Sequence, residues 1–132
     1  MRKSIIVAAA LALAGCTTTA ETLDEQMAGQ QPPSAALRQK VVDAARVMLA
    51  DPYSVRDVSI SSYVPAPQRP GSGFVCVRYN AKNGFGGYVG LKTVGTNVIN
   101  GELRGLWENP YQCAMPSLQW HPLPEARQLQ NL

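Results

Sequence analysis

The chain has 132 residues, which suits one small domain, and 12 lysines and arginines against 9 acidic residues give a net charge of +3. Two of the cations, Arg2 and Lys3, belong to the first few residues, so the rest of the chain is nearly balanced in charge. It lacks the one-sided basic stripe of a nucleic-acid-binding protein, which argues against a nucleic-acid partner.

The first fifteen residues have the layout of a bacterial export signal. Arg2 and Lys3 precede an uncharged apolar run from Ile5 to Leu13, and small residues follow that run. A membrane-spanning helix needs about 20 apolar residues, but polar threonines begin here at residue 17. We therefore predict that residues 1–15 form a signal peptide that is removed, and not a permanent membrane span.

The end of this segment, Leu13-Ala14-Gly15-Cys16, resembles the lipobox of bacterial lipoproteins at all four positions. The resemblance implies cleavage before Cys16, a diacylglyceryl group on its sulfur and an acyl chain on the new amine. Two or more acyl chains anchor a protein firmly, because each buried methylene contributes about 0.8 kcal/mol. In a Gram-negative bacterium, Thr17 at the next position implies sorting to the outer membrane, facing the periplasm. An ordinary secretory signal that ends near a cysteine is the alternative.

A polar tether and an amphipathic helix are predicted next. Residues 16–33 contain few large apolar side chains, so we expect a lipidated tether without a core, with at most a transient helical turn over residues 21–27. Ser34 is a favourable N-cap for a helix from Ala35 to about Ala50, which Asp51-Pro52 would end. Apolar residues recur on one face of this helix, at Leu37, Val41, Ala44, Ala45 and Met48. Such a stripe is typical of a helix that packs on a sheet.

The hydrophobic period then changes to that of strands. Strands are predicted over residues 57–64, 74–79 and 87–94. A tight turn at residues 95–97 would lead to Val98-Ile99, and Asn100-Gly101 is a hairpin signal. Beyond Trp107 the chain is rich in proline, with a short helical turn expected over residues 125–129. We predict a small α+β domain over residues 34–132, with one N-terminal amphipathic helix packed on an antiparallel sheet of about four strands.

The cysteines agree with an exported protein. If Cys16 is acylated, Cys76 and Cys113 remain, and in an oxidising compartment this pair is expected to form a disulfide. The bond would close a loop of about 38 residues and stabilise the fold by about 4 kcal/mol in the chain-entropy model. Two free thiols are the alternative. A metal site is disfavoured, because His121 supplies only a third ligand.

Residues 80–90 form the most unusual stretch, with four glycines among them. Their spacing fits neither a dinucleotide-binding fingerprint nor a phosphate-binding P-loop, and no helix is predicted after them. The simpler interpretation is a glycine-rich turn between strands. The functional interpretation is a loop that contacts a partner or ligand through aromatic and basic side chains, with candidate contact residues Arg78, Lys82, Asn83, Phe85 and Tyr88.

Two motifs in residues 40–95 carry a further resemblance. Asp51-Pro52-Tyr53-Ser54 follows the predicted helix, and the run Asn80 to Tyr88 (NAKNGFGGY) follows a cysteine-bearing strand. This combination looks like a small domain of bacterial envelope proteins, lipoproteins among them, although Val77 stands after the cysteine where that domain commonly has glycine. The resemblance implies a domain boundary and no particular activity.

Catalysis finds little support in these residues. His121 is the single histidine, no nucleophile-elbow motif is present, and a catalytic thiolate at Cys76 or Cys113 would compete with the disulfide. We therefore expect no enzyme activity, no cofactor and no metal. The favoured function is a lipid-anchored envelope protein with a structural or protein-interaction role, held to the membrane by its lipid. A small-ligand-binding module, or an enzyme that uses the glycine-rich loop 80–90, is the alternative.

The anchor can be tested directly at Cys16. Replacing Cys16→Ser removes the sulfur that would carry the diacylglyceryl group, so lipid labelling should be lost and the protein should leave the membrane fraction. Radiolabelled palmitate incorporation and cell fractionation measure the two effects. Retention of the variant in membranes would count against the lipid anchor.

Overall fold

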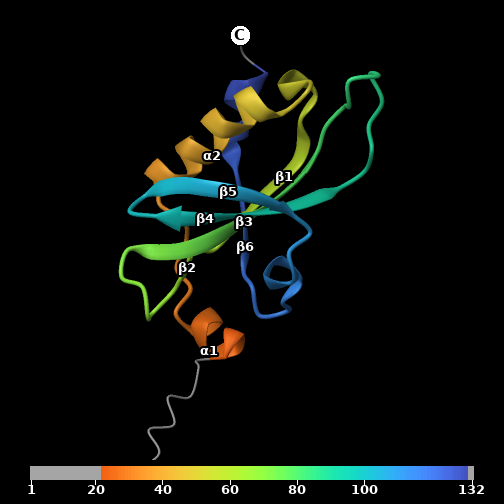
Figure 1. Ribbon diagram of the computed structural model, residues 1–132. Coiled ribbons are helices and arrows are strands. Elements are labelled where there is room, and N and C mark those ends of the chain that lie inside the picture. Colours follow the sequence, from red (N-terminus) through yellow and green to blue (C-terminus); the bar gives the residue numbers. More distant parts are fainter. Residues whose placement is uncertain (1–21, 131–132) are drawn as a thin grey trace, which may run out of the picture.

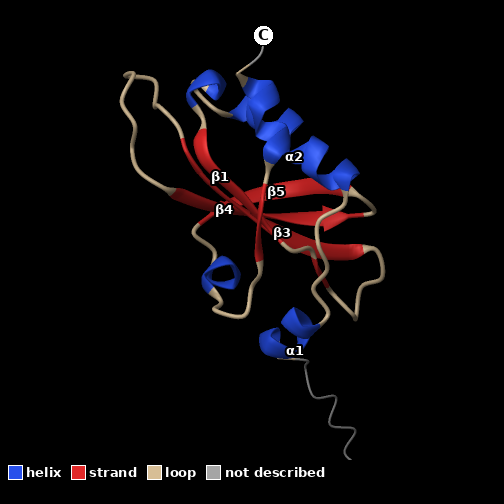
Figure 2. Ribbon diagram, turned by 180° about the vertical axis from the view of Figure 1, so that it is seen from behind, coloured by secondary structure: helices blue, strands red, loops and turns tan. Residues whose placement is uncertain are grey.

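The computed structural model describes residues 22–130, so the predicted signal peptide and the lipobox with Cys16 lie outside the described residues. The described part has the predicted α+β class, with an antiparallel sheet and a few helices. The sheet has the order β5-β4-β3-β1-β6, with β2 paired beside β3 (Figures 1 and 2). Its strands are β1 (Arg56–Ser61), β2 (Val64–Pro65), β3 (Ser72–Asn80), β4 (Lys92–Ile99), β5 (Glu102–Glu108) and β6 (Trp120–Pro122).

The prediction of about four strands was wrong, because the sheet has six. The error lies mainly after β3. Residues 95–97, predicted as a turn, lie in the middle of β4 and pair with β3, while most of residues 87–94 belongs to a loop. Gly86 and Gly90 adopt positive φ values there, which breaks an extended chain. The Asn100-Gly101 hairpin is confirmed, and both residues have the positive φ of a type I′ turn.

Helix α2 (Ala35–Met48) is the predicted amphipathic helix, and it lies across one face of the sheet (Figure 1). Ser34 caps it as predicted, because its hydroxyl accepts a hydrogen bond from the Leu37 amide at 3.1 Å. The helix ends slightly earlier than expected, since Leu49 is already extended. Leu37, Val41 and Val42 are buried, whereas Met48 is exposed although it belongs to the apolar stripe.

The second half of the predicted tether belongs to the folded body. Helix α1 (Leu23–Ala28) is capped by Thr22 and Glu25, and Met27 is only 1% exposed. The side chain of Gln30 accepts from the Gln119 amide and donates to the Ser117 carbonyl, at 2.8 Å each. Burying one methionine and forming these long-range hydrogen bonds compensates for the scarcity of apolar residues on which the tether prediction rested.

Two apolar clusters cover the two faces of the sheet. The larger joins α2 and the short helix η3 (Pro124–Leu129) to Ile60, Val75 and Val94. The smaller lies behind the sheet, where Met27, Val64 and Leu118 surround Cys76 and Cys113. Two further single-turn helices are η1 (Pro52–Ser54), between α2 and β1, and η2 (Tyr111–Ala114), between β5 and β6. The sheet is therefore sandwiched, with α2 on one face and the disulfide on the other.

The disulfide between Cys76 and Cys113 is confirmed. The two Cα atoms are 5.7 Å apart, and the bond joins η2 to the central strand β3. Both cysteines are buried, and a Cβ at Gly95, opposite Cys76 on β4, would lie 3.1 Å from the Cys113 sulfur. The same Cβ would lie 2.7 Å from the Pro110 ring, so the chain before η2 and the disulfide pack closely on β4 at this glycine.

Removing the disulfide should cost stability without changing the fold. The pair Cys76→Ala and Cys113→Ala should lower the free energy of unfolding by about 4 kcal/mol, because the unfolded chain regains the entropy of an open loop. Urea denaturation of the variant and of the reduced wild type should agree. Equal midpoints for oxidised and reduced wild-type protein would contradict the prediction.

Candidate functional site

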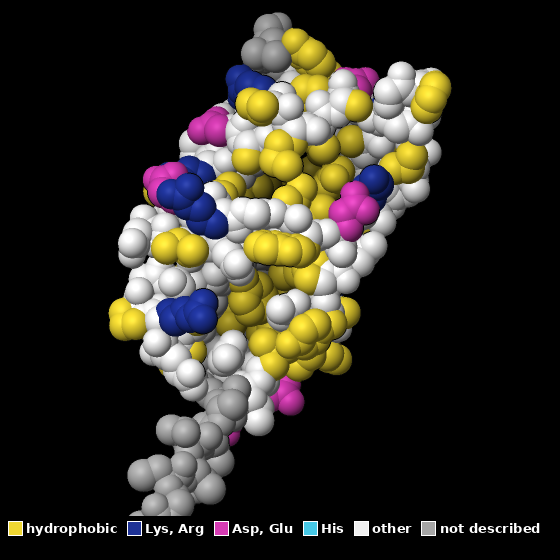
Figure 3. Space-filling model, in the orientation of Figure 1, with side chains coloured by type: hydrophobic (Ala, Val, Ile, Leu, Met, Phe, Trp, Pro, Cys, Tyr) yellow, Lys and Arg dark blue, Asp and Glu magenta, His cyan; other side chains and the backbone are white. Residues whose placement is uncertain are grey.

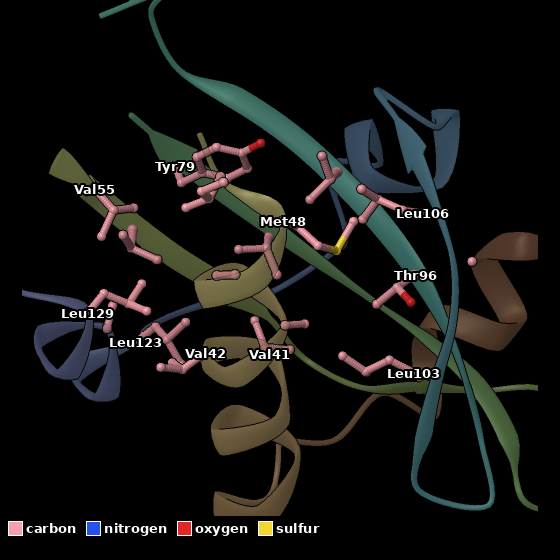
Figure 4. A pocket seen from close by; sticks show the side chains of 18 residues that line it. Val41, Val42, Met48, Val55, Tyr79, Thr96, Leu103, Leu106, Leu123 and Leu129 are labelled. Atoms are coloured by element: carbon pink, nitrogen blue, oxygen red, sulfur yellow. The ribbon is translucent and has the colours of Figure 1, made fainter. Parts of the chain in front are cut away.

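An apolar cavity of about 410 Å³ opens between the second half of α2 and the sheet. Figure 3 shows the molecular surface hollowed here, with hydrophobic side chains exposed in the hollow. Figure 4 shows side chains from α2, β4, β5 and the C-terminal segment converging on it, among them Val41, Met48, Leu103, Leu106 and Leu123. Its volume falls in the range of about 300–1,000 Å³ that is typical of ligand-binding pockets.

Small side chains on α2 create the space. Ala44 and Ala45 face the sheet where a larger residue would fill the gap, and both line the cavity. The interior of a folded protein is normally packed as tightly as an organic crystal. An apolar space of this size also offers water few hydrogen-bond partners. The cavity is therefore better suited to an apolar chain than to water.

A β-bulge shapes the opposite wall. The pairing of β4 with β5 shifts between Gly95 and Asn97, where Gly105 adopts a φ of +73°. In a regular strand, residues three apart point to opposite faces, but the extra residue turns both Leu103 and Leu106 toward the cavity. A Cβ at Gly105 would lie 2.5 Å from the Trp107 ring, so glycine is required there.

Two polar side chains stand among the described residues that line the cavity, Tyr79 and Thr96. The Thr96 hydroxyl donates to the Asn97 carbonyl at 3.2 Å. Figure 4 places the Tyr79 ring at one end of the cavity, with its hydroxyl turned away from the labelled aliphatic side chains. Burial raises the pKa of Tyr79, and nearby Glu108 raises it further, so the hydroxyl stays protonated and remains a donor at neutral pH.

Lys92 and Glu108 lie beside Tyr79 on the face of the sheet that carries α2. Lys92 is directly opposite Tyr79 on the neighbouring strand, and Glu108 is opposite Val94, which lines the cavity. Opposite residues in an antiparallel pair project from the same face. The Lys92 ammonium and the Glu108 carboxylate are 3.8 Å apart and largely exposed, so their ion pair is weak.

The glycine-rich loop forms a separate, ordered arm between β3 and β4. Asn83 accepts hydrogen bonds from the amides of Phe85 and Gly87, at 3.0 and 3.2 Å. The Tyr88 hydroxyl donates to the Ser54 carbonyl at 2.8 Å. Phe85 nevertheless remains 99% exposed. The loop thus presents an aromatic ring to solvent on a fixed backbone.

Four of the five predicted contact residues share this arm, and one does not. Two cations lie near the Tyr88 ring, with the Arg56 guanidinium 3.6 Å and the Lys82 ammonium 5.6 Å from its centre. Arg78 instead stacks on Trp120 at 3.7 Å and belongs to the sheet. Arg56, which sequence reasoning missed, is the arginine that lies beside Tyr88.

His121 is half-buried and hydrogen-bonded within the fold. Its Nε2 atom lies 2.7 Å from the Ser62 hydroxyl, a distance that would suit a nucleophile and its base. Ser62, however, is 0% exposed, so its oxygen cannot approach a substrate. Both candidate thiols are consumed by the disulfide. The Ser62–His121 pair therefore joins β6 to the segment after β1 and supplies no accessible nucleophile.

Within residues 22–130, no group of three or more histidines, cysteines or carboxylates is arranged to hold a metal ion. No helix in that part of the chain is long and apolar enough to cross a membrane.

Comparison with known proteins gives no family for this chain. No family model, no curated protein and no solved structure matches it.

Proposed function

We propose that this protein is a non-catalytic, lipid-anchored envelope protein that binds an apolar chain in the cavity between α2 and the sheet. The observation that supports this best is the open apolar space of about 410 Å³, walled by three separate parts of the fold. A long alkyl chain is the kind of apolar occupant that a space of this size can bury. Such a chain would be buried by Val41, Val77, Leu103 and their neighbours.

The same observation favours ligand binding over a purely structural role. Building Ala44 and Ala45 into the packing face of α2 forgoes apolar burial that would stabilise the fold, at about 25 cal/mol for each Å². A small domain has little stability to lose. A bound chain would restore that burial, and the protein would be more stable with the ligand than without it.

Filling the cavity should abolish binding. Ala45→Trp places a large ring in the space, and Leu106→Glu puts a charge on its wall at a half-exposed position. Dodecanol should displace the neutral dye Nile red from the wild-type protein with one site per chain, and neither variant should bind the dye. Ala36→Trp on the exposed side of α2 is the matched control and should bind normally.

Unchanged dye binding by both cavity variants would refute this function. Circular dichroism checks that each variant is folded, and Leu106→Glu keeps the test valid should the larger ring at residue 45 disturb α2. Thermal unfolding provides a second readout, because dodecanol should raise the midpoint of the wild type and of Ala36→Trp only.

The exposed arm supports a second candidate function, the docking of an envelope protein partner. Phe85 is an ordered, fully exposed aromatic ring, with Lys82 and Arg56 close to the neighbouring Tyr88. Aromatic and arginine side chains carry much of the binding energy at protein interfaces. The arm also lies at the end of the molecule away from α1, where it is accessible if the chain is anchored through residue 16 (Figure 1).

A partner of the arm should be lost when its tip is removed. The double variant Lys82→Ala and Phe85→Ala should keep its fold but weaken the complex by about 2 kcal/mol, since an exposed ring that becomes buried in an interface is a typical hot spot. Pull-downs from crosslinked membranes measure this. Arg46→Ala with Val47→Ala removes a cation and an apolar side chain from the exposed side of α2 and is the control. If the two double variants recover every partner equally, the arm has no role in docking and is only a turn between strands.

A further inference from the structure

We infer that the cavity takes an amphiphile with an anionic head, specifically a long-chain carboxylate, whose head is held at the mouth by Tyr79 and Lys92. This inference rests on the proposed chain-binding function and adds the chemical class of the ligand. It follows from the position of the polar groups at one end of the cavity and from the charges that they carry.

The first argument is the position of the polar groups. Apart from Thr96, whose hydroxyl is already bonded to the backbone, the polar side chain lining the described cavity is that of Tyr79. The Tyr79 hydroxyl lies at one end, turned away from the aliphatic wall (Figure 4). No hydrogen bond of this hydroxyl occurs within residues 22–130, so the donor is available to a ligand. A ligand with its tail inside would therefore place its head at Tyr79.

The second argument is charge. Lys92 projects from the same face as Tyr79 and directly opposite it, so its flexible side chain can reach a head group beside the tyrosine hydroxyl. The Lys92 ammonium offers only donors and the protonated Tyr79 hydroxyl offers one, whereas carboxylate oxygens are only acceptors. Charge-assisted hydrogen bonds of this kind are about twice as strong as neutral ones. The mouth is thus complementary to a carboxylate.

Glu108 is the group that opposes this assignment, because its carboxylate repels an anionic head and attracts a cationic one. The preference for an anionic or a cationic ligand therefore tests the inference. It lies 3.8 Å from Lys92 and close enough to Tyr79 to influence its hydroxyl. A carboxylate ligand would compete with Glu108 for Lys92, whereas an amine ligand would pair with Glu108. Glu108 is 72% exposed and its pair with Lys92 is long, so a ligand head displaces it at little cost.

The experiment compares three ligands of equal chain length, dodecanoate, dodecanol and dodecylamine, by displacement of Nile red from the purified full-length chain. Dodecanoate should bind about tenfold more tightly than dodecanol, a difference of about 1.4 kcal/mol. Lys92→Gln should remove most of this preference, and Tyr79→Phe part of it. Glu108→Gln should strengthen the binding of dodecanoate several-fold. Dodecanol, whose head is uncharged, should respond less than dodecanoate to each of the three changes.

Arg69→Gln is the matched control, because it removes one positive charge from the turn before β3, outside the cavity lining. It should leave the preference for dodecanoate unchanged. Equal binding of dodecanoate and dodecanol, or a preference for dodecylamine that Glu108→Gln abolishes, would overturn the inference while leaving chain binding intact. If none of the three ligands displaces Nile red, the proposed chain-binding function itself is refuted.

Occupation of the cavity by a second copy of the chain is the remaining outcome. It would appear in light scattering as a dimer that Leu106→Glu converts to a monomer, with no displacement of that dimer by dodecanoate. This result would also overturn the inference, because it assigns the apolar walls to a protein interface.

Discussion

The packing of α2 on the sheet is the contact on which the rest of the structure depends, and it is tight along only part of the helix. In the first half, Leu37, Val41 and Val42 are buried, and Arg38 donates to the Glu125 carboxylate at 2.7 Å and to the Pro33 carbonyl at 2.9 Å. The Arg38 hydrogen bond lowers the pKa of Glu125, so this contact is charged at neutral pH and weakens only when acid protonates the carboxylate. In the second half, small side chains keep α2 and the sheet apart, and the cavity results.

The far face of the sheet explains how an open cavity remains compatible with a stable fold. Cys76 lies on β3 between Val75 and Val77, and its disulfide to Cys113 fixes η2 behind the strand whose other face forms the cavity wall. The smaller apolar cluster with Met27 closes over that bond. A cross-link stabilises the fold mainly through the unfolded chain, so it supplies stability that the incomplete packing of α2 does not. The ordered wall and the unfilled space are thus consistent with each other.

Local signals in the sequence were sufficient for the elements that depend on few residues. The Ser34 cap, the α2 stripe, β3 and the Asn100-Gly101 hairpin all follow from side chains within a few positions of one another. The cavity could not be foreseen in this way. It arises where Ala45 of α2 and Leu106 of β5 line the same space, and a β-bulge turns Leu106 inward. Both the bulge and the packing of the helix over it depend on contacts between different elements of the fold. The glycine at residue 105 was a signal for the bulge, because an isolated glycine in a strand often marks one. Arg56 was missed beside Tyr88 because the two residues are distant in sequence.

The placement of the two candidate sites has a consequence for how a lipid-anchored form would work. If Cys16 carries the proposed lipid, five residues separate it from Thr22, where the described fold begins, and the six steps from Cys16 to Thr22 span about 20 Å at most in an extended chain. The end of the molecule with α1 would then stay near the bilayer, while the arm with Phe85 lies at the other end (Figure 1). The cavity opens between α2 and β5, in the part of the molecule away from α1 (Figures 1 and 3). With the molecule upright on so short a tether, the cavity would face the aqueous compartment, and a ligand would reach it from there or from a partner on the arm.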